Sequence, residues 1–440
     1  MAGELILTAT LHRAAYQAMP TPQQAFILLE AMPAANDPTA ASTPVFGHQA
    51  VNFSLVLDRS GSMAGEKLNQ LKAAARMVVD RLGPQDYLSI VTFDERAEVI
   101  VPAAPVQDLA AIHRRIDLIE ERGGTHMSSG MQVGLREIQC GLSADRVSRM
   151  VLLTDGQTWE DQTDCENLAD QARAYGIPLY AMGLGVGAEN NWDPRFLENL
   201  AQRSGGEWAA IDAPDKVSTV FADILSAMQG AAVTNASLTI RFVEGVDPRT
   251  VWRVLPVISK LGHSAVTRTD IQLFLGDIQQ QVGQSLLLDM LLPVRNPGAY
   301  RLLQADISYD VPGSGQVGQR ASVDIVVPYT LDQALAQQMH PGVLNLAERV
   351  VAHKLQTQAL DEAAAGQVQK ATVRLRAAAT RLLDLGETEL AQQSMLHADQ
   401  MEQSGMLDPA AAQQLRYATK HLTDFDPANP SDPAKSASGT

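Results

Sequence analysis

The sequence predicts an α/β domain with a doubly wound, mostly parallel sheet, which is inserted in or flanked by a β-sandwich and followed by an α-helical C-terminal region. Three patterns lead to this prediction. Strand and helix signals alternate over residues 47–230, strands without helical spacing fill residues 231–330, and stripes of Ala and Leu at helical spacing occupy residues 331–424. Strands separated by helices favour right-handed crossovers and a parallel sheet with helices on both faces.

The length and composition fit several globular domains. The 440 residues correspond to about three domains of ~150 residues each, and a hydrophobic content of 45% is ordinary for such domains. The 50 acidic residues outnumber the 34 Lys and Arg, which gives a net charge of −16. This charge argues against nucleic acids and anionic membranes as partners, because their phosphate groups would be repelled.

We expect a cytoplasmic protein. The chain has two cysteines, Cys140 and Cys165, and such sparse use favours a reducing compartment. The first residues lack the features of a signal peptide, and no apolar stretch approaches the ~18 residues of a membrane-spanning helix. Both cysteines are interpreted as inert thiols, since no His/Asp pattern accompanies them.

Residues 1–46 contain strand-like runs at 5–11 and 25–30, followed by a loop-rich tract. Two strands alone are marginal in water and need a larger sheet. We therefore expect residues 1–46 to supply the N-terminal strands of the β-sandwich formed by residues 231–330, with the α/β domain as an insertion between them.

The α/β region, residues 47–230, alternates strands and helices. Its strand-like runs lie at 51–57, 87–93, 148–154, 177–185 and 206–211. Apolar residues at helical spacing lie at 68–82 and 109–119, and a further helix is expected over 127–140. Ligands of open α/β sheets bind at the carboxyl ends of the strands, so the loops after these runs are the places to look for a site.

The remaining regions carry simpler patterns. Gly, Pro and Asn turns separate the strand-like runs of residues 231–330, as in an antiparallel sandwich. Residues 331–424, with Gly386 and Gly405 as helix stops, fit either a helical bundle or a pair of helical repeats. The composition of residues 425–440 is typical of a disordered tail.

Three polar segments are expected to meet at the carboxyl edge of the α/β sheet. The first strand runs into Asp58-Arg59-Ser60-Gly61-Ser62, the loop Gly123-Gly124-Thr125 precedes a helix, and Thr154-Asp155-Gly156 ends another strand. Together they offer carboxylate and hydroxyl oxygens, which are hard ligands suited to Mg²⁺ or Mn²⁺ rather than zinc, with Ca²⁺ as a further candidate.

These segments resemble the von Willebrand factor A (VWA) domain in their order: Asp-x-Ser-x-Ser, then Gly-Gly-Thr before a helix, then Leu-Leu-Thr-Asp-Gly closing a strand. The resemblance covers about residues 48–228 and includes the glycines at 183–187 and 204–206. It implies a metal-ion-dependent adhesion site, MIDAS, whose ligand set is Asp58, Ser60, Ser62, Thr125 and Asp155. In that family the hydroxyls approach the metal directly, one or both Asp act through water, and the open position accepts a carboxylate of a partner protein.

The expected function is a non-enzymatic, divalent-cation-dependent protein-interaction module or scaffold, which binds an Asp or Glu of its partner. The chain is similar to bacterial stand-alone VWA proteins, including those related to inter-alpha-trypsin-inhibitor heavy chains. That resemblance brings in a MoxR-type AAA+ ATPase as a candidate partner.

The alternative is a Mg²⁺-dependent hydrolase or phosphoryl-transfer enzyme with Asp58 as nucleophile. Phosphatases of the haloacid-dehalogenase type place a second Asp two residues after the first, whereas this chain has Ser60 there. The sequence therefore favours the binding module.

Weaker candidates lie around the expected site. His126 and Trp159 are placed on a partner-binding rim, although a solvated or packed histidine and a packed indole are the competing interpretations. The acids between Asp155 and Glu166 are explained by the dipole of a following helix. The glycines at 183–187 match a phosphate-binding loop only weakly.

Overall fold

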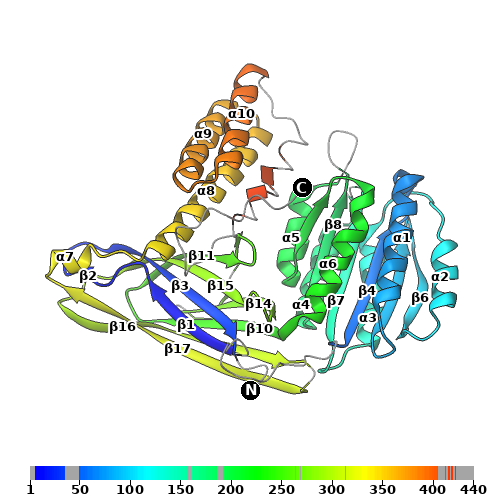
Figure 1. Cartoon of the computed structure of the whole chain (residues 1–440), viewed down its shortest axis with the longest axis horizontal. Coiled ribbons are helices and arrows are strands. Elements are labelled where there is room, and N and C mark those ends of the chain that lie inside the picture. The colour runs from blue at the N-terminus through cyan, green and yellow to red at the C-terminus, as the bar shows by residue number, and fades with distance from the viewer. Residues whose placement is uncertain are drawn as a thin grey trace.

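The computed structural model describes residues 5–34, 49–156, 158, 160–185, 192–262, 264–267, 269–312, 314–404, 412, 415–416, 418–419 and 422. Figure 1 shows the α/β domain at one side of the molecule, the strands of the β-sandwich at the other, and the C-terminal helices beside both. The expected tail at 425–440 lies outside the described residues.

In the described part of the chain, the α/β domain has one sheet with the strand order β6-β5-β4-β7-β8-β9. The strands are β4 (Val51–Asp58), β5 (Tyr87–Phe93), β6 (Ala97–Pro105), β7 (Val147–Thr154), β8 (Leu179–Leu184) and β9 (Trp208–Ile211). All neighbours are parallel except β6, which is antiparallel to β5. The mostly parallel sheet confirms the predicted fold class.

Strand β6 is a difference from the sequence prediction. It forms the edge of the sheet, contains Pro102 and Pro105, and leaves most of its side chains at least partly exposed. Edge strands tolerate proline and do not need an apolar run. The sequence therefore carries little signal for this strand.

Helices cover both faces of this sheet. They are α1 (Glu66–Arg81), α2 (Leu109–Asp117), α3 (Met127–Cys140), α4 (Gln162–Ala174), α5 (Pro194–Ser204) and α6 (Val217–Gln229). Side chains of α1, α2 and α6 pack in one core with Leu55 and Leu57 of β4, whereas α3, α4 and α5 pack in another with Val56. Alternate residues of a strand face opposite sides, so β4 is buried from both.

Two further sheets form the β-sandwich. One has the order β1-β3-β15-β11-β12 and the other β13-β14-β10-β16-β17-β2. The strands are β1 (Leu5–Leu11), β2 (Tyr16–Gln17), β3 (Gln23–Pro33), β10 (Ala231–Phe242), β11 (Asp247–Leu255), β12 (Ser259–Lys260), β13 (Ser264–Ala265), β14 (Asp270–Gln279), β15 (Gln284–Leu292), β16 (Gly298–Val311) and β17 (Gln316–Thr330).

The N-terminal strands are part of this sandwich. Strand β3 pairs with β1 on one side and with β15 on the other, and Ile27 shares a core with Leu238 and Leu288. The chain thus enters the α/β domain from one sheet and returns to the sandwich at β10. The boundaries of the individual domains, as the sequence places them, stay predictions.

The C-terminal helices stand on the sandwich. They are α7 (Gln333–Ala336), α8 (Pro341–Ala364), α9 (Val368–Asp384) and α10 (Thr388–Ser404). The start of α8 packs Val343 and Leu346 against Trp252 and Leu287 of the first sheet, and its later turns pack against α9 and α10. Within the described residues, none of the helices is both long and apolar enough to cross a bilayer.

Candidate metal centre

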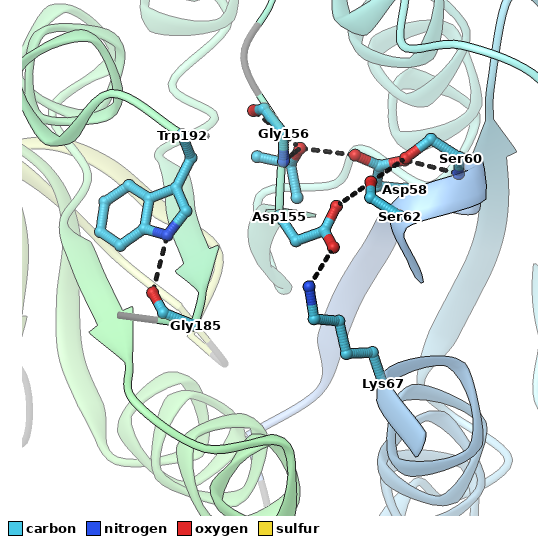
Figure 2. A network of polar contacts seen from close by, with 9 residues as sticks. Asp58, Ser60, Ser62, Lys67, Asp155, Gly156, Gly185 and Trp192 are labelled. Atoms are coloured by element: carbon cyan, nitrogen blue, oxygen red, sulfur yellow. Dashed lines mark hydrogen bonds and ion pairs between the residues drawn. The ribbon is translucent and has the colours of Figure 1, made fainter. Parts of the chain in front are cut away.

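The five expected ligands lie at the point where the chain reverses its winding of the sheet. Strand β4 lies between β5 and β7, and the chain continues from β4 through α1 to β5 but reaches β7 later, on the other side. The crevice above two such strands is the usual ligand position of an open α/β sheet. Asp58 is the last residue of β4, and Asp155 directly follows β7 (Figure 2).

The first segment buries a carboxylate and turns two serines toward each other. Asp58 is fully buried, and its oxygens accept hydrogen bonds from the Ser60 backbone N–H at 2.8 Å and from Thr154 Oγ1 at 2.5 Å. A 3-10 turn over Gly61–Met63 follows, and Ser60 Oγ lies 3.1 Å from Ser62 Oγ. Hydroxyl and carboxylate oxygens therefore gather at the end of β4.

The third segment joins this group through Asp155, whose side chain is 0% exposed. Ser62 Oγ donates to Asp155 Oδ1 at 2.7 Å, and Lys67 Nζ lies 2.6 Å from Asp155 Oδ2 (Figure 2). Lys67 comes from the first turn of α1. Both oxygens of Asp155 are thus engaged, one by a hydroxyl and one by an ammonium group.

Backbone contacts bring the second segment to the same place. The Gly61 N–H donates to the Gly123 carbonyl at 3.1 Å, and the Arg122 N–H donates to the Arg59 carbonyl at 2.8 Å. A Cβ atom on Gly156 would lie 3.3 Å from Thr125 Oγ1. The absence of a side chain at Gly156 therefore leaves room for the Thr125 hydroxyl beside the two carboxylates.

A buried arginine braces these loops. Arg59 is 5% exposed; its Nε lies 2.8 Å from Asp94 Oδ2 and its Nη1 lies 2.8 Å from Glu98 Oε2. The Asp94 carbonyl in turn accepts from the His126 N–H at 2.7 Å. The loop after β5 therefore supports the first and second segments without contributing a ligand.

Sequence reasoning missed Lys67, Thr154, Arg59 and Asp94. A signal existed for Lys67, because a cation in the first turn of a helix opposes the helix dipole and needs a local anion. A signal also existed for Arg59, because an arginine directly after a buried strand requires an acidic partner. Neither signal predicts which acidic residue is the partner.

The electrostatics of the group are unbalanced. Burial, together with a smaller contribution from the negative charge of Asp155, raises the pKa of Asp58 to about 6, although the hydrogen bonds from Thr154 and Ser60 lower it. Among the described side chains of this group, two acids face the single ammonium of Lys67. An additional cation would relieve the remaining negative charge.

The residues fit a hard divalent cation. The donor set is entirely oxygen, it comes from three segments, and Gly156 leaves space at its centre. Within the described residues, no group of three or more His, Cys, Asp or Glu offers an alternative metal site. Such oxygen sets suit Mg²⁺ and Mn²⁺, which commonly keep several waters.

The two rim residues have different outcomes. His126 is the residue before α3, and its side chain is 47% exposed. Its Nδ1 lies 3.4 Å from Asp161 Oδ2 and from Ser128 Oγ, so the ring has partners within the domain. Trp159 lies outside the described residues.

The neighbouring acids and glycines have structural roles. Asp161 accepts from the Ser128 N–H at 2.6 Å and so caps α3, and Glu166 contacts Arg203. Trp192 covers Gly183 and donates its Nε1–H to the Gly185 carbonyl at 2.9 Å (Figure 2). The described glycines of 183–187 therefore accommodate an indole ring.

The cysteines are separate from the site. Cys165 is buried in the core beneath α4, and burial raises the pKa of its thiol. Cys140 ends α3 and contacts the Arg136 carbonyl. The raised pKa of Cys165 is the opposite of what a reactive thiolate needs.

Comparison with known families agrees with this architecture. Residues 52–222 match the von Willebrand factor type A domain, and residues 341–424 match the Sll0103-like C-terminal alpha-helical domain. The chain therefore contains a VWA domain and a C-terminal helical domain. The first is a protein-interaction module.

Individual relatives cover different parts of the chain. The uncharacterized protein sll0103 of Synechocystis sp. is 32% identical over 60% of this chain and 63% of its own length. Inter-alpha-trypsin inhibitor heavy chain H3 of Pongo abelii is 31% identical over 35% of this chain and 18% of its own length. The chain thus spans less than two thirds of either relative.

More than one solved structure matches nearly the whole chain. A von Willebrand factor type A protein from Catenulispora acidiphila superposes with a TM-score of 0.75 at 16% identity, covering 94% of this chain and 96% of that one. At this identity the likeness shows the fold alone.

Proposed function

We propose that this chain is a divalent-cation-dependent protein-interaction module, in which Asp58, Ser60, Ser62, Thr125 and Asp155 hold Mg²⁺ or Mn²⁺ and a partner protein contributes an Asp or Glu carboxylate. The observation that carries the proposal is the meeting of three polar segments at the carboxyl edge of β4 and β7. The bound ion supplies a positive centre with an open coordination position for an anion.

The residues of the chain prepare this position. Thr154 and the Ser60 N–H orient the Asp58 carboxylate, and the Ser62 proton points to Asp155, which leaves hydroxyl lone pairs for an ion. Ser62 is exposed and Thr125 half-buried, whereas both carboxylates are buried. A partner can therefore reach the hydroxyl side of the site but not the carboxylates.

A titration of metal ions tests the ligand set. Calorimetry should show Mg²⁺ binding by the full chain, and Asp155→Ala or Thr125→Val should weaken it about 10–100-fold, the scale for disturbed metal sites. Thr125→Ser is the matched control, since it keeps the hydroxyl and should stay near the original affinity. Equal affinity in all four proteins would refute the site.

Capture of a partner tests the interaction. A partner retained by the full chain should be lost with chelator and with Thr125→Val, and a MoxR-type AAA+ ATPase is the first candidate for a direct assay. Phosphatase and nucleotide-hydrolysis assays with Mg²⁺ address the alternative. Turnover that disappears with Asp58→Ala would replace the binding module with an enzyme. The cytoplasmic location stays a prediction.

A further inference from the structure

Lys67 is the charged residue of the site that the ligand motif does not include. Its Nζ lies 2.6 Å from Asp155 Oδ2, the Asp155 side chain is 0% exposed and that of Lys67 is 27% exposed. The ammonium is therefore held against a buried carboxylate that Ser62 already approaches from the other oxygen. Figure 2 shows the lysine reaching this carboxylate from α1, on the side away from Ser60.

Other charged groups lie near the loops. Arg59 is paired with Asp94 and Glu98, Glu66 contacts the Gln70 amide, and the Glu95 side chain lies beside Gly123 and Gly124. Among the described residues, the charges that contact the ligand hydroxyls and carboxylates directly are Asp58, Asp155 and Lys67. With Lys67 this set has one excess negative charge, and without it the excess is two.

This difference has opposite consequences for a cation and for an anion. When Lys67 is present, a bound divalent cation changes the net charge of this set from −1 to +1. When the lysine is removed, the cation changes the net charge from −2 to zero. A carboxylate that binds next brings the net charge to zero when Lys67 is present, but makes it negative when Lys67 is absent. The positive end of the α1 dipole, at the turn that carries Lys67, adds to the positive side.

We propose that Lys67 is the specificity-determining cation of this site: it weakens binding of the divalent cation alone and strengthens binding of an anionic group once the cation is there. Cation and carboxylate consequently bind cooperatively, so the site holds the cation less tightly when no partner carboxylate is bound. This inference rests on the proposed function, because it presumes the cation.

Lys67 also stabilises the metal-free protein. Without it, Asp155 would be a buried carboxylate lacking its ionic partner, which is costly. Lys67→Met keeps the aliphatic stem and removes the charge, whereas Lys67→Arg keeps the charge. Lys72→Met is the matched control, since Lys72 lies on the same helix and contacts the Asp117 carbonyl far from the ligands.

Three measurements test the proposal on the full chain. In chelator, Lys67→Met should melt below the original protein and gain more from added Mg²⁺. In calorimetry, Lys67→Met should bind Mg²⁺ about tenfold more tightly, while Lys67→Arg and Lys72→Met stay within about twofold. Replacing chloride with acetate at constant ionic strength should tighten Mg²⁺ binding by the original protein and do so less for Lys67→Met, because linked binding is reciprocal.

The outcomes separate the two proposals. If the original protein binds no Mg²⁺, the metal site itself fails. If it binds Mg²⁺ but Lys67→Met binds no more tightly, or if acetate acts equally on both, Lys67 has only a structural role and this inference is overturned. A lower melting temperature of Lys67→Met in chelator, with unchanged Mg²⁺ and acetate binding, is that structural result.

Discussion

Strand β7 carries a buried charged cluster near each end, and the two differ in balance. At its start, Arg149 is 2% exposed and its Nη2 lies 2.9 Å from Oδ2 of Asp277 in β14, which is 6% exposed. Beyond its end, Asp155 lies against the ammonium of Lys67, whereas the neighbouring buried Asp58 accepts hydrogen bonds from Thr154 and Ser60 only, among the described contacts. The first cluster is a matched ion pair that joins the α/β domain to the sandwich, and the second is left with excess negative charge. Charge balance thus distinguishes a joint of the fold from a place that can accept an ion.

Breaking the balanced pair should have the largest effect on stability. Arg149→Met leaves Asp277 as a buried charge without its partner and should cost about 3–5 kcal/mol of unfolding free energy, as for other broken buried pairs. Urea unfolding measures this, and Mg²⁺ affinity should not change. Arg301→Met, which removes the half-exposed partner of Asp324, is the control and should cost less than about 1 kcal/mol. A similar loss in both variants would show that burial does not decide the effect.

A third way to bury an ionisable group is to keep it neutral, as at His12 in the sandwich. The ring is 3% exposed. Arg13 Nε donates to its Nε2 at 3.1 Å, so the proton of the neutral ring is on Nδ1, which lies 3.3 Å from the Phe26 carbonyl. Burial, with the charge of Arg13, lowers the pKa of His12 from 6.5 to about 4. Below pH 6.5 the unfolded chain takes up a proton at His12 that the folded chain does not. The contribution of His12 to the unfolding free energy is therefore fully present above pH 6.5 and is lost as the pH falls toward 4.

The expected loss from His12 is about 2–3 kcal/mol, from about 1.4 kcal/mol per unit of pKa difference. Unfolding curves between pH 7 and 4 measure it, compared with His12→Gln, which removes this contribution. A slope in His12→Gln as steep as in the original protein would contradict the prediction.

Removing a charge from the unbalanced cluster should raise the unfolding free energy instead of lowering it. Asp58→Asn removes a buried charge next to Asp155, so in chelator the protein should gain about 1 kcal/mol of unfolding free energy while losing Mg²⁺ binding. Thermal unfolding with and without Mg²⁺ measures both. Asp94→Asn is the contrasting variant, because Asp94 is paired with Arg59 and its replacement should destabilise. Destabilisation by Asp58→Asn in chelator would mean that its hydrogen bonds outweigh its charge.

The two clusters also differ in how well they could be predicted from the sequence. Each of the five expected ligands lies next to a strand end or helix start, where Gly, Ser and Asp give a local signal, and the structure brings them together. The pairing of Arg149 with Asp277 joins residues 128 positions apart and depends on how two domains pack. No local pattern encodes such a contact.

The sequence also offers little indication of strand β6 and of the buried face of α8, for related reasons. Strand β6 is an edge strand with little apolar pattern. In α8, Leu344 and Val351 are spaced as on one helical face but are only half-buried, whereas Val343, Leu346 and Val350 are buried. This helix packs on the sheet at its start and on two helices later, so a single apolar face does not describe it.

The smallest effect is expected where balanced charges join regions at the surface. Asp361 of α8 lies 2.9 Å from Arg195 Nη2 of α5 and 2.7 Å from Arg416 Nη2, and Arg416 Nη1 lies 3.5 Å from Glu198 Oε2. These contacts join the VWA domain to the helical region, as Arg149 and Asp277 join it to the sandwich, but Asp361 is about half exposed. Exposed pairs gain little because water and salt screen them. Asp361→Asn should therefore change unfolding free energy by less than about 1 kcal/mol at 0.15 M salt, with a somewhat larger change at low salt. A loss as large as that of Arg149→Met in the same urea experiment would show that the network, rather than the burial of each pair, sets the strength of a joint between domains.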